Sequence, residues 1–244
     1  MKHQTTNVLK WENEWTYVEK KLKESGCDSF GGGNAFSQYP FRSRFLHVRR
    51  VMKWAKRILS DFPKIDLDAL ELAIIFHDVG YSLGDNKKHQ ENSRMLFHEY
   101  RQEKCRTCEH NDAENASMQD CAAKIWKDPK RLDLVEYLIE NHSRKELLGE
   151  PDQVPELVLL MEADVLDEEG AMRIAWDCMA EGMGGGSSFQ DALFHTRKFW
   201  NPGYDPMVTP KAKQLWAEKQ KLVRAYIAQM ELDLEMADDL SNGV

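Results

Sequence analysis

Several segments of this chain share one helical pattern, in which a histidine or an aspartate stands at the end of a stripe of apolar residues. His77, His142 and Asp164 each follow apolar residues at positions i−7, i−4 and i−3, a spacing that places these side chains on one face of an α-helix. His47 stands at the opposite end of such a stripe, with apolar residues following it at helical spacing. The pattern predicts a helical protein with several polar side chains aimed at its interior. The apolar members of the four stripes are Leu70, Ala73 and Ile74; Val135, Leu138 and Ile139; Leu157, Leu160 and Met161; and Val51, Trp54, Ala55 and Ile58.

The polar residues on these stripes have the chemistry of metal ligands. A carboxylate on the apolar face of a helix is costly unless it is paired or binds a metal ion. His47, the adjacent pair His77 and Asp78, and Asp164 form a set that suits a divalent ion such as Mn²⁺, Mg²⁺, Fe²⁺, Ni²⁺ or Zn²⁺. Taken singly, His47 could be a hydrogen-bonded core histidine, Asp78 the end of a helix before Gly80, and Asp164 the partner of an arginine. The agreement of the four favours one metal site with positions open for water and substrate, which is typical of metal-assisted hydrolysis.

The rest of the sequence predicts an all-α protein without internal repeats. No long strand-like alternation occurs, and glycine runs at 31–33 and 184–186 interrupt the helical pattern with loops. Asp66 is a predicted N-cap, and the pair Thr209 and Pro210 is a predicted start of the last long helix. The polar, cysteine-bearing stretch near 104–116 is expected to be an insertion or a connecting loop. The expected helices cover about residues 8–24, 41–61, 67–78, 88–103, 118–126, 131–142, 155–164, 170–181 and 210 onward.

Composition limits the class of protein. With 244 residues and 42% hydrophobic content, the chain can bury a full core as one domain. The net charge of −8 argues against broad binding of nucleic acid or anionic membranes, although a local basic patch could hold a small anion. Residues 1–10 lack the apolar core of a signal peptide, no apolar run reaches membrane-spanning length, and the five cysteines form no small-domain disulfide framework. We therefore expect a soluble cytoplasmic protein.

The ordered ligand set resembles the H…HD…D pattern of the HD-domain superfamily of metal-dependent phosphohydrolases, and most of all its small stand-alone bacterial hydrolases. The likeness implies an HD-domain helical bundle over 40–235. An N-terminal helix and glycine-rich loop (1–39) would pack on this bundle, and a disordered tail (236–244) would follow it. The segments that carry the resemblance are Arg44-x-x-His47-x-x-Arg50-Val51, Leu72-Ala73-Ile74-Ile75-Phe76-His77-Asp78-Val79-Gly80, His89-x-x-x-Ser93, Ile139-x-x-His142-Ser143, Glu162-Ala163-Asp164-Val165-Leu166-Asp167-x-x-Gly170-Ala171 and Thr209-Pro210-x-Ala212-Lys213.

The resemblance also implies roles for individual residues. In the family the ligands bind one divalent ion and sometimes two, and the ion activates a water molecule that attacks a phosphate ester or anhydride. Asp78 is expected to act as a ligand and to orient that water. His142 and His89 are candidates for support of the ligands, for phosphate contact or for general acid catalysis. Either histidine could instead be a structural core residue.

Basic residues near the ligands are candidates for substrate binding. Arg44 and Arg50 stand at i−3 and i+3 of His47, so they flank the ligand on the same helix face. A guanidinium there could hold a phosphate through two hydrogen bonds. Lys87, in the loop after the His77 and Asp78 pair, is a further candidate with weaker support. The competing interpretation is a solvated basic face that pairs with the chain's own acidic residues, and it is favoured for the other basic residues of this helix.

Three functions from different classes follow from these residues. The leading hypothesis is a metal-dependent phosphohydrolase of the phosphatase, pyrophosphohydrolase or phosphodiesterase type, acting on a small phosphorylated compound expected to be a nucleotide. The Gly-Tyr-Pro extension of the cyclic-di-GMP phosphodiesterase branch is missing, because Ser82 follows Gly80 and Tyr81. A second hypothesis is an HD-fold di-iron oxygenase, in which His89 and His142 would bind a second ion. A third is a non-catalytic metal- or nucleotide-binding protein, against which the intact ligand set argues.

A separate group of cysteines carries a weaker signal. Cys105 and Cys108, followed by His110 and later by Cys121, are residue types suited to a structural zinc ion. The short spacing between Cys108 and the histidine is unusual for such a site, so reduced thiols are the favoured interpretation.

Overall fold

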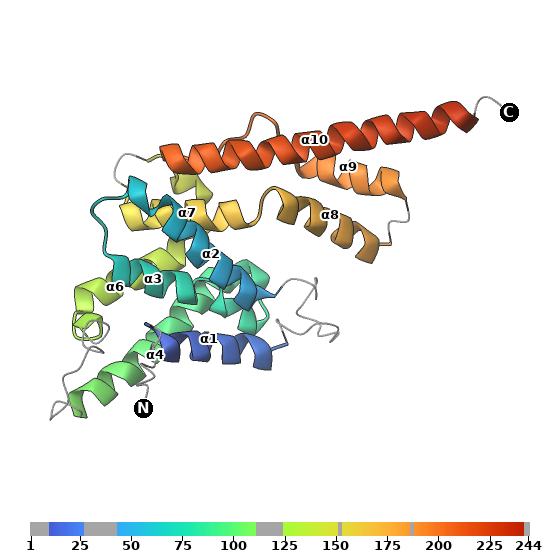
Figure 1. Ribbon diagram of the computed structural model, residues 1–244. Helices are drawn as coiled ribbons and strands as arrows, with labels where there is room; N and C mark the ends of the chain where they lie inside the picture. The colour runs from blue at the N-terminus through green and yellow to red at the C-terminus, as the bar shows by residue number, and fades with distance from the viewer. Residues whose placement is uncertain (1–9, 27–42, 111–123, 151–152, 186–187, 242–244) are drawn as a thin grey trace, which may run out of the picture. The chain divides into compact units, whose positions relative to one another are not determined.

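The computed structural model describes residues 10–26, 43–110, 124–150, 153–185 and 188–241 (Figure 1). Within these residues the chain forms nine α-helices and no β-strand, which confirms the all-α prediction. The chain divides into two compact units, Met1–Met161 and Glu162–Val244. Among the described helices, none combines the length and the apolar character that a membrane span requires.

Helix α3 (Leu67–Phe76) forms the centre of the first unit. All of its side chains from Ala69 to Phe76 are buried, as expected for a helix that is apolar nearly all round. It packs against α1 (Glu12–Glu24), α2 (Arg44–Ile58) and α6 (Pro129–Asn141). Helix α4 (His89–His110) packs against α6 and against η2 (Val79–Leu83), a 3₁₀ helix that follows α3. The ends of several helices therefore meet beside the end of α3.

Side-chain caps mark where three helices of the first unit, α2, α3 and α6, begin. The Asp66 carboxylate accepts a hydrogen bond from the Ala69 N–H, which confirms the predicted N-cap of α3. Ser43 caps α2 in the same way, and Asp128 caps α6, whose first residue is a proline. A side chain that satisfies one of the free N–H groups at a helix start stabilises it by about 1 kcal/mol. These caps fix the register of the helices that carry the site.

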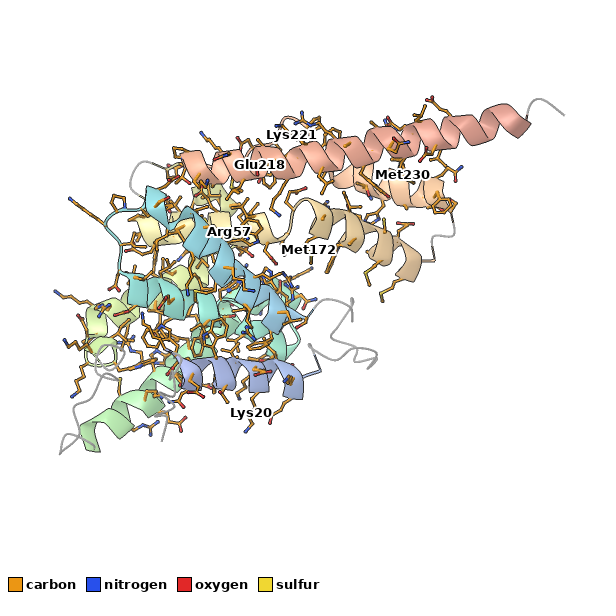
Figure 2. The ribbon with its side chains drawn as sticks, viewed as in Figure 1. Lys20, Arg57, Met172, Glu218, Lys221 and Met230 are labelled. Atoms are coloured by element: carbon orange, nitrogen blue, oxygen red, sulfur yellow. The ribbon has the colours of Figure 1, made fainter. Side chains whose placement is uncertain are left out.

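Helix α1 is bound to the core of the first unit by apolar and polar contacts. Val18 and Leu22 are fully buried, and the ring of Tyr17 lies 5.8 Å from the ring of Phe76. The indole N–H of Trp11 donates a 2.9 Å hydrogen bond to the Glu71 carboxylate. The opposite face of α1 carries charged side chains such as Lys20, which lies on its outer side (Figure 2).

The second unit is built from three helices and the end of a fourth. Helices α8 (Ala171–Met183), α9 (Phe189–Phe199) and α10 (Pro210–Ser241) pack on one another. Leu193, Val223 and Ile227 form their buried cluster, against which Met230 packs, while Glu218 and Lys221 lie on an exposed part of α10 (Figure 2). Helix α7 (Pro155–Asp167) begins in the first unit and ends in the second.

The buried side chain of Glu162 fixes the start of α10. Its carboxylate accepts hydrogen bonds from the N–H groups of Val208 and Thr209 and from the Thr209 hydroxyl, at 2.6, 2.8 and 2.7 Å. Glu162 therefore joins α7 to α10 within the second unit. This contact gives a structural reason for two of the segments that carry the family resemblance, the one that begins at Glu162 and the one that begins at Thr209.

The observed helices differ from the predicted ones in three places. Helix α9 is not predicted by periodicity, because it is short and its start is set by a capping box between Ser188 and Asp191. Helix α4 continues to His110, so 104–110 is helical rather than a connecting loop; its polar residues give no apolar stripe to mark it. Helix α10 includes 236–241, which were expected to form a disordered tail. Most of the expected helix 118–126 lies outside the described residues.

Candidate metal centre

Asp78 lies at the centre of a group of four buried histidines in the first unit. Its Oδ2 atom is 3.4 Å from Nε2 of His47 and 3.7 Å from Nε2 of His77. Its Oδ1 atom is 3.6 Å from Nε2 of His142 and 3.9 Å from Nε2 of His89. As whole residues, Asp78 is 3% exposed and no histidine of the group exceeds 9%. Four imidazole nitrogens therefore face one buried carboxylate, two at each oxygen.

The histidines reach Asp78 because they occupy the ends of different helices. His47 lies in the first turn of α2, and His77 is the C-cap of α3. His142 is the C-cap of α6, and His89 is the first residue of α4. Asp78 itself is the N-cap residue of η2, directly after α3. The structure thus brings together, from four helices, five residues that the sequence analysis proposes for the site.

Backbone carbonyls set the tautomer of three of the histidines. Nδ1 of His77 donates to the Ile74 carbonyl at 2.8 Å, and Nδ1 of His142 donates to the Ile139 carbonyl at 2.7 Å. His89 makes the same contact, at 2.9 Å, with the carbonyl of the residue three positions before it. A carbonyl can only accept, so Nδ1 carries the proton and the lone pair of the neutral ring is on Nε2. That arrangement is the one a metal-binding histidine needs.

The electrostatics of the group favour an ionised carboxylate. Burial alone would raise the pKa of Asp78, but the neighbouring His77, His142 and Arg44 hold it well below its usual value. Burial lowers the pKa of His89, and the charge of Asp78 opposes that effect. A charged carboxylate and a neutral imidazole are the forms in which both residue types bind metal ions.

The atoms form two triads that share Asp78. One contains His47, His77 and Asp78, and the other contains Asp78, His89 and His142; in each, the ligand atoms lie within 4.8 Å of one another. The nitrogen–oxygen distances exceed those of ordinary hydrogen bonds. They suit two ligands that share an ion, since each bond to the ion would be about 2.1 Å long. The donor set therefore fits a divalent ion in the first triad and has the ligand types for another in the second.

Of the three predicted phosphate-binding residues, Arg44 lies at the site. Its Nη1 donates to Oδ2 of Asp78 at 3.3 Å, and its guanidinium carbon lies 3.7 Å from the centre of the Tyr81 ring. Arg50 is half-buried on α2, and Lys87 is exposed in the 3₁₀ helix η3 (Asn86–Lys88), two residues before His89. Substrate binding by these two residues stays a prediction. Tyr81 is a site residue that the sequence pattern does not reveal, because nothing in its spacing separates it from other loop tyrosines.

The last predicted ligand, Asp164, lies on α7, three residues beyond the boundary of the first unit. The buried residues that precede it, Leu157, Leu160 and Met161, confirm the apolar stripe that singles it out. Its role as a ligand stays a prediction. The cysteine group is only partly described: Cys105 donates through its thiol to the Trp126 carbonyl at 3.3 Å, whereas the side chains of Cys108 and His110 and the whole of Cys121 lie outside the described residues.

Comparison with known proteins places this site in a family. The HD domain model matches residues 44–169, a segment that contains every ligand candidate. The fold is similar to that of YpgQ from Bacillus subtilis, with a TM-score of 0.55 and 21% identity over 92% of this chain and 95% of that chain. It is also similar to the structural-genomics target LpR71 from Lactobacillus plantarum, with a TM-score of 0.51 and 18% identity over 97% of this chain and 100% of that chain. A search of curated proteins found no match. The chain belongs to the HD domain family.

Proposed function

We propose that this protein is a metal-dependent phosphohydrolase that cleaves a phosphate ester or anhydride of a small molecule, with a nucleotide as the expected substrate. The observation that carries the proposal is the buried Asp78 carboxylate with four histidine Nε2 atoms around it, in a chain of the HD domain family. Membership of that family supports this reaction class, and the site supplies groups suited to it.

His47, His77 and Asp78 would hold the divalent ion, with Asp164 as the proposed fourth ligand. A bound ion supplies a water of lowered pKa and neutralises charge that develops on a phosphoryl oxygen. Burial of the ligands keeps bulk water away from the site and strengthens each electrostatic contact within it. The Nδ1 bond of His77 to the Ile74 carbonyl holds its ring in place, so that little reorganisation is needed.

Arg44 is the proposed phosphate-binding residue. Its guanidinium donates a hydrogen bond to the Asp78 carboxylate. A phosphate that binds beside Asp78 would therefore replace that hydrogen bond or accept a second one from the same guanidinium. An arginine is suited to this role because its planar N–H groups match two phosphate oxygens at once. The positive charge would be placed at the oxygen where negative charge increases during cleavage.

His89 and His142 are proposed to serve the reaction in one of two ways. If one ion is bound, their Nε2 atoms face the space beside Asp78 and can contact the phosphate or carry a proton to the leaving oxygen. If a second ion is bound, the same atoms and the Asp78 carboxylate would hold it. Counting the metal ions that remain bound to wild type and to His89→Ala distinguishes these arrangements.

The proposal is tested by release of phosphate or pyrophosphate from a panel of nucleotides with added Mn²⁺. Nucleoside mono-, di- and triphosphates report phosphatase and pyrophosphohydrolase activity, and a cyclic nucleotide reports phosphodiesterase activity. Release that is abolished in Asp78→Asn would support the proposal. Full release by Asp78→Asn would attribute the activity to a contaminant or to another site.

The second triad favours one alternative, an HD-fold di-iron oxygenase. Asp78, His89 and His142 offer the nitrogen and oxygen ligands that a second iron would require. Two irons per chain with substrate-dependent oxygen uptake, and no phosphate release from any compound of the panel, would establish the oxygenase. One exchangeable Mn²⁺ with phosphate release would exclude it.

A further inference from the structure

The ring of Tyr81 lies between two groups of the site. The Arg44 guanidinium carbon is 3.7 Å from the ring centre. The imidazole of His89 is 4.4 Å from the same centre and nearly parallel, with 15° between the planes. Two planar groups this close to one six-membered ring would overlap if they shared a face, so Arg44 and His89 stack on opposite faces of the phenol ring.

The two stacked groups approach different oxygens of Asp78. Arg44 donates to Oδ2 at 3.3 Å, and Nε2 of His89 lies 3.9 Å from Oδ1. The backbone N–H of Tyr81 donates to the Asp78 carbonyl at 3.2 Å, so a tight turn fixes the tyrosine relative to that residue. The stack therefore connects α2, η2 and the start of α4 at the carboxylate.

We propose that Tyr81 is a positioning residue for phosphate binding, which acts by holding Arg44 and His89 at fixed places beside Asp78. This inference rests on the proposed function. Stacking engages the face of a guanidinium and leaves its edge, where the N–H groups lie, available for hydrogen bonds to Asp78 and to a phosphate. An arginine side chain that is not stacked would sample many rotamers and would lose more freedom when the phosphate binds.

The proposal assigns the effect to the ring of Tyr81 rather than to its hydroxyl. Phenylalanine retains both stacking faces, whereas leucine retains the apolar volume and loses the aromatic faces. Tyr81→Phe is therefore the conservative variant and Tyr81→Leu the disruptive one. Tyr137→Leu is a matched control, because Tyr137 is an exposed tyrosine on α6.

The first test is binding of inorganic phosphate to the Mn²⁺-loaded protein, measured by isothermal titration calorimetry. Tyr81→Leu should weaken phosphate binding about tenfold, the size of one desolvated cation–π contact. Tyr81→Phe and Tyr137→Leu should bind within about twofold of wild type. Equal weakening in Tyr81→Leu and Tyr81→Phe would assign the effect to the hydroxyl and overturn the inference, as would unchanged binding in Tyr81→Leu or no phosphate binding by wild type.

The second test separates positioning from general stability. If Tyr81 acts through Arg44, Tyr81→Leu should have a smaller effect on phosphate affinity in an Arg44→Ala background than in wild type. Equal effects in both backgrounds would show that the ring does not act through Arg44 and would overturn the inference. These measurements need no turnover, so the absence of phosphate release by wild type would overturn the proposed hydrolase without deciding the outcome for Tyr81.

Discussion

Gly80 and Ser93 are joined by a buried hydrogen bond, in which the glycine N–H donates to the serine hydroxyl at 2.8 Å. A Cβ atom on Gly80 would lie 2.1 Å from the carbonyl oxygen of His89 and 2.4 Å from the backbone nitrogen of Ser93. The lack of a side chain at Gly80 therefore lets the first turn of α4 approach η2. That approach places His89 beside Asp78, and it explains why a glycine follows the His77 and Asp78 pair so closely.

We expect Gly80→Ala to displace the start of α4 and to weaken metal binding, because the clash is with backbone atoms that cannot rotate away. Overpacking of this kind costs about 1–3 kcal/mol of unfolding free energy. The measurement is urea denaturation together with metal content. Gly182→Ala in α8 is the control, because no atom lies within 4 Å of the added methyl group. A Gly80→Ala variant as stable and as metal-loaded as Gly182→Ala would contradict this account of the glycine.

Substitution of the proposed ligands should remove the metal with little loss of fold. His77→Ala and Asp78→Ala are each expected to abolish metal binding and turnover, since a ligand lost from a site of few ligands cannot be replaced. Metal content and circular dichroism measured on the same samples check both parts of the prediction. His98→Ala is the matched control, because His98 is half-exposed on α4 and contacts Glu136 instead of the site. Full metal content and turnover in either ligand variant would show the site assignment to be wrong.

Glu162→Gln should destabilise the second unit. The amide has one acceptor oxygen where the carboxylate has two, and its NH₂ group would face the donors of Val208 and Thr209. Loss of charged hydrogen bonds at a buried position costs about 1.5–3 kcal/mol. Glu218→Gln, an exposed change on α10, should stay within about 0.5 kcal/mol of wild type. Denaturant unfolding of both variants measures these free energies. Equal unfolding midpoints for Glu162→Gln and Glu218→Gln would disprove the structural role of Glu162.

The pH dependence of stability should reveal the ion pair between Asp66 and Arg131. The hydrogen bond from Arg131 holds the pKa of Asp66 below its usual value, against the raising effect of burial. Because the folded-state pKa of Asp66 is lowered, its ionised carboxylate contributes its full stabilisation at pH values above the unfolded-state pKa of about 3.9. That contribution is lost as the pH falls through the folded-state pKa. We therefore expect Arg131→Leu to lower the unfolding free energy near neutral pH and to have a smaller effect in strong acid. An effect of the same size at both pH values, in urea melts, would count against the ion pair.

Periodicity was sufficient to predict the parts of the fold that are buried along one helix face. The stripes before His77 and His142 end at the C-caps of α3 and α6 because burial imposes the 3.6-residue repeat on those helices. Helix α9 could not be predicted in this way, because its start depends on the capping box at Ser188 rather than on a long apolar stripe. The polar C-terminal end of α4 could not be predicted from periodicity either, because exposed helical turns need no apolar pattern.

The residues of the candidate site likewise divide into those that could be predicted from the sequence and those that could not. His47, His77, Asp78, His89 and His142 could be selected from sequence because each breaks an apolar pattern or belongs to a resemblance. The stack of Arg44, Tyr81 and His89 could not, since it depends on how η2 and α4 pack around Gly80. Spacing along the chain identifies side chains that share one helix, whereas contacts among three elements require the tertiary structure.

A metal centre at Asp78 is tested by the metal content of wild type and of Asp78→Asn after equilibration with Mn²⁺ and gel filtration, measured by inductively coupled plasma mass spectrometry. Asparagine keeps the shape of the aspartate and removes the charge that the four histidines surround. We expect at least one ion per wild-type chain and none in the variant. An equal content in both proteins, or none in either, would contradict a metal centre at Asp78.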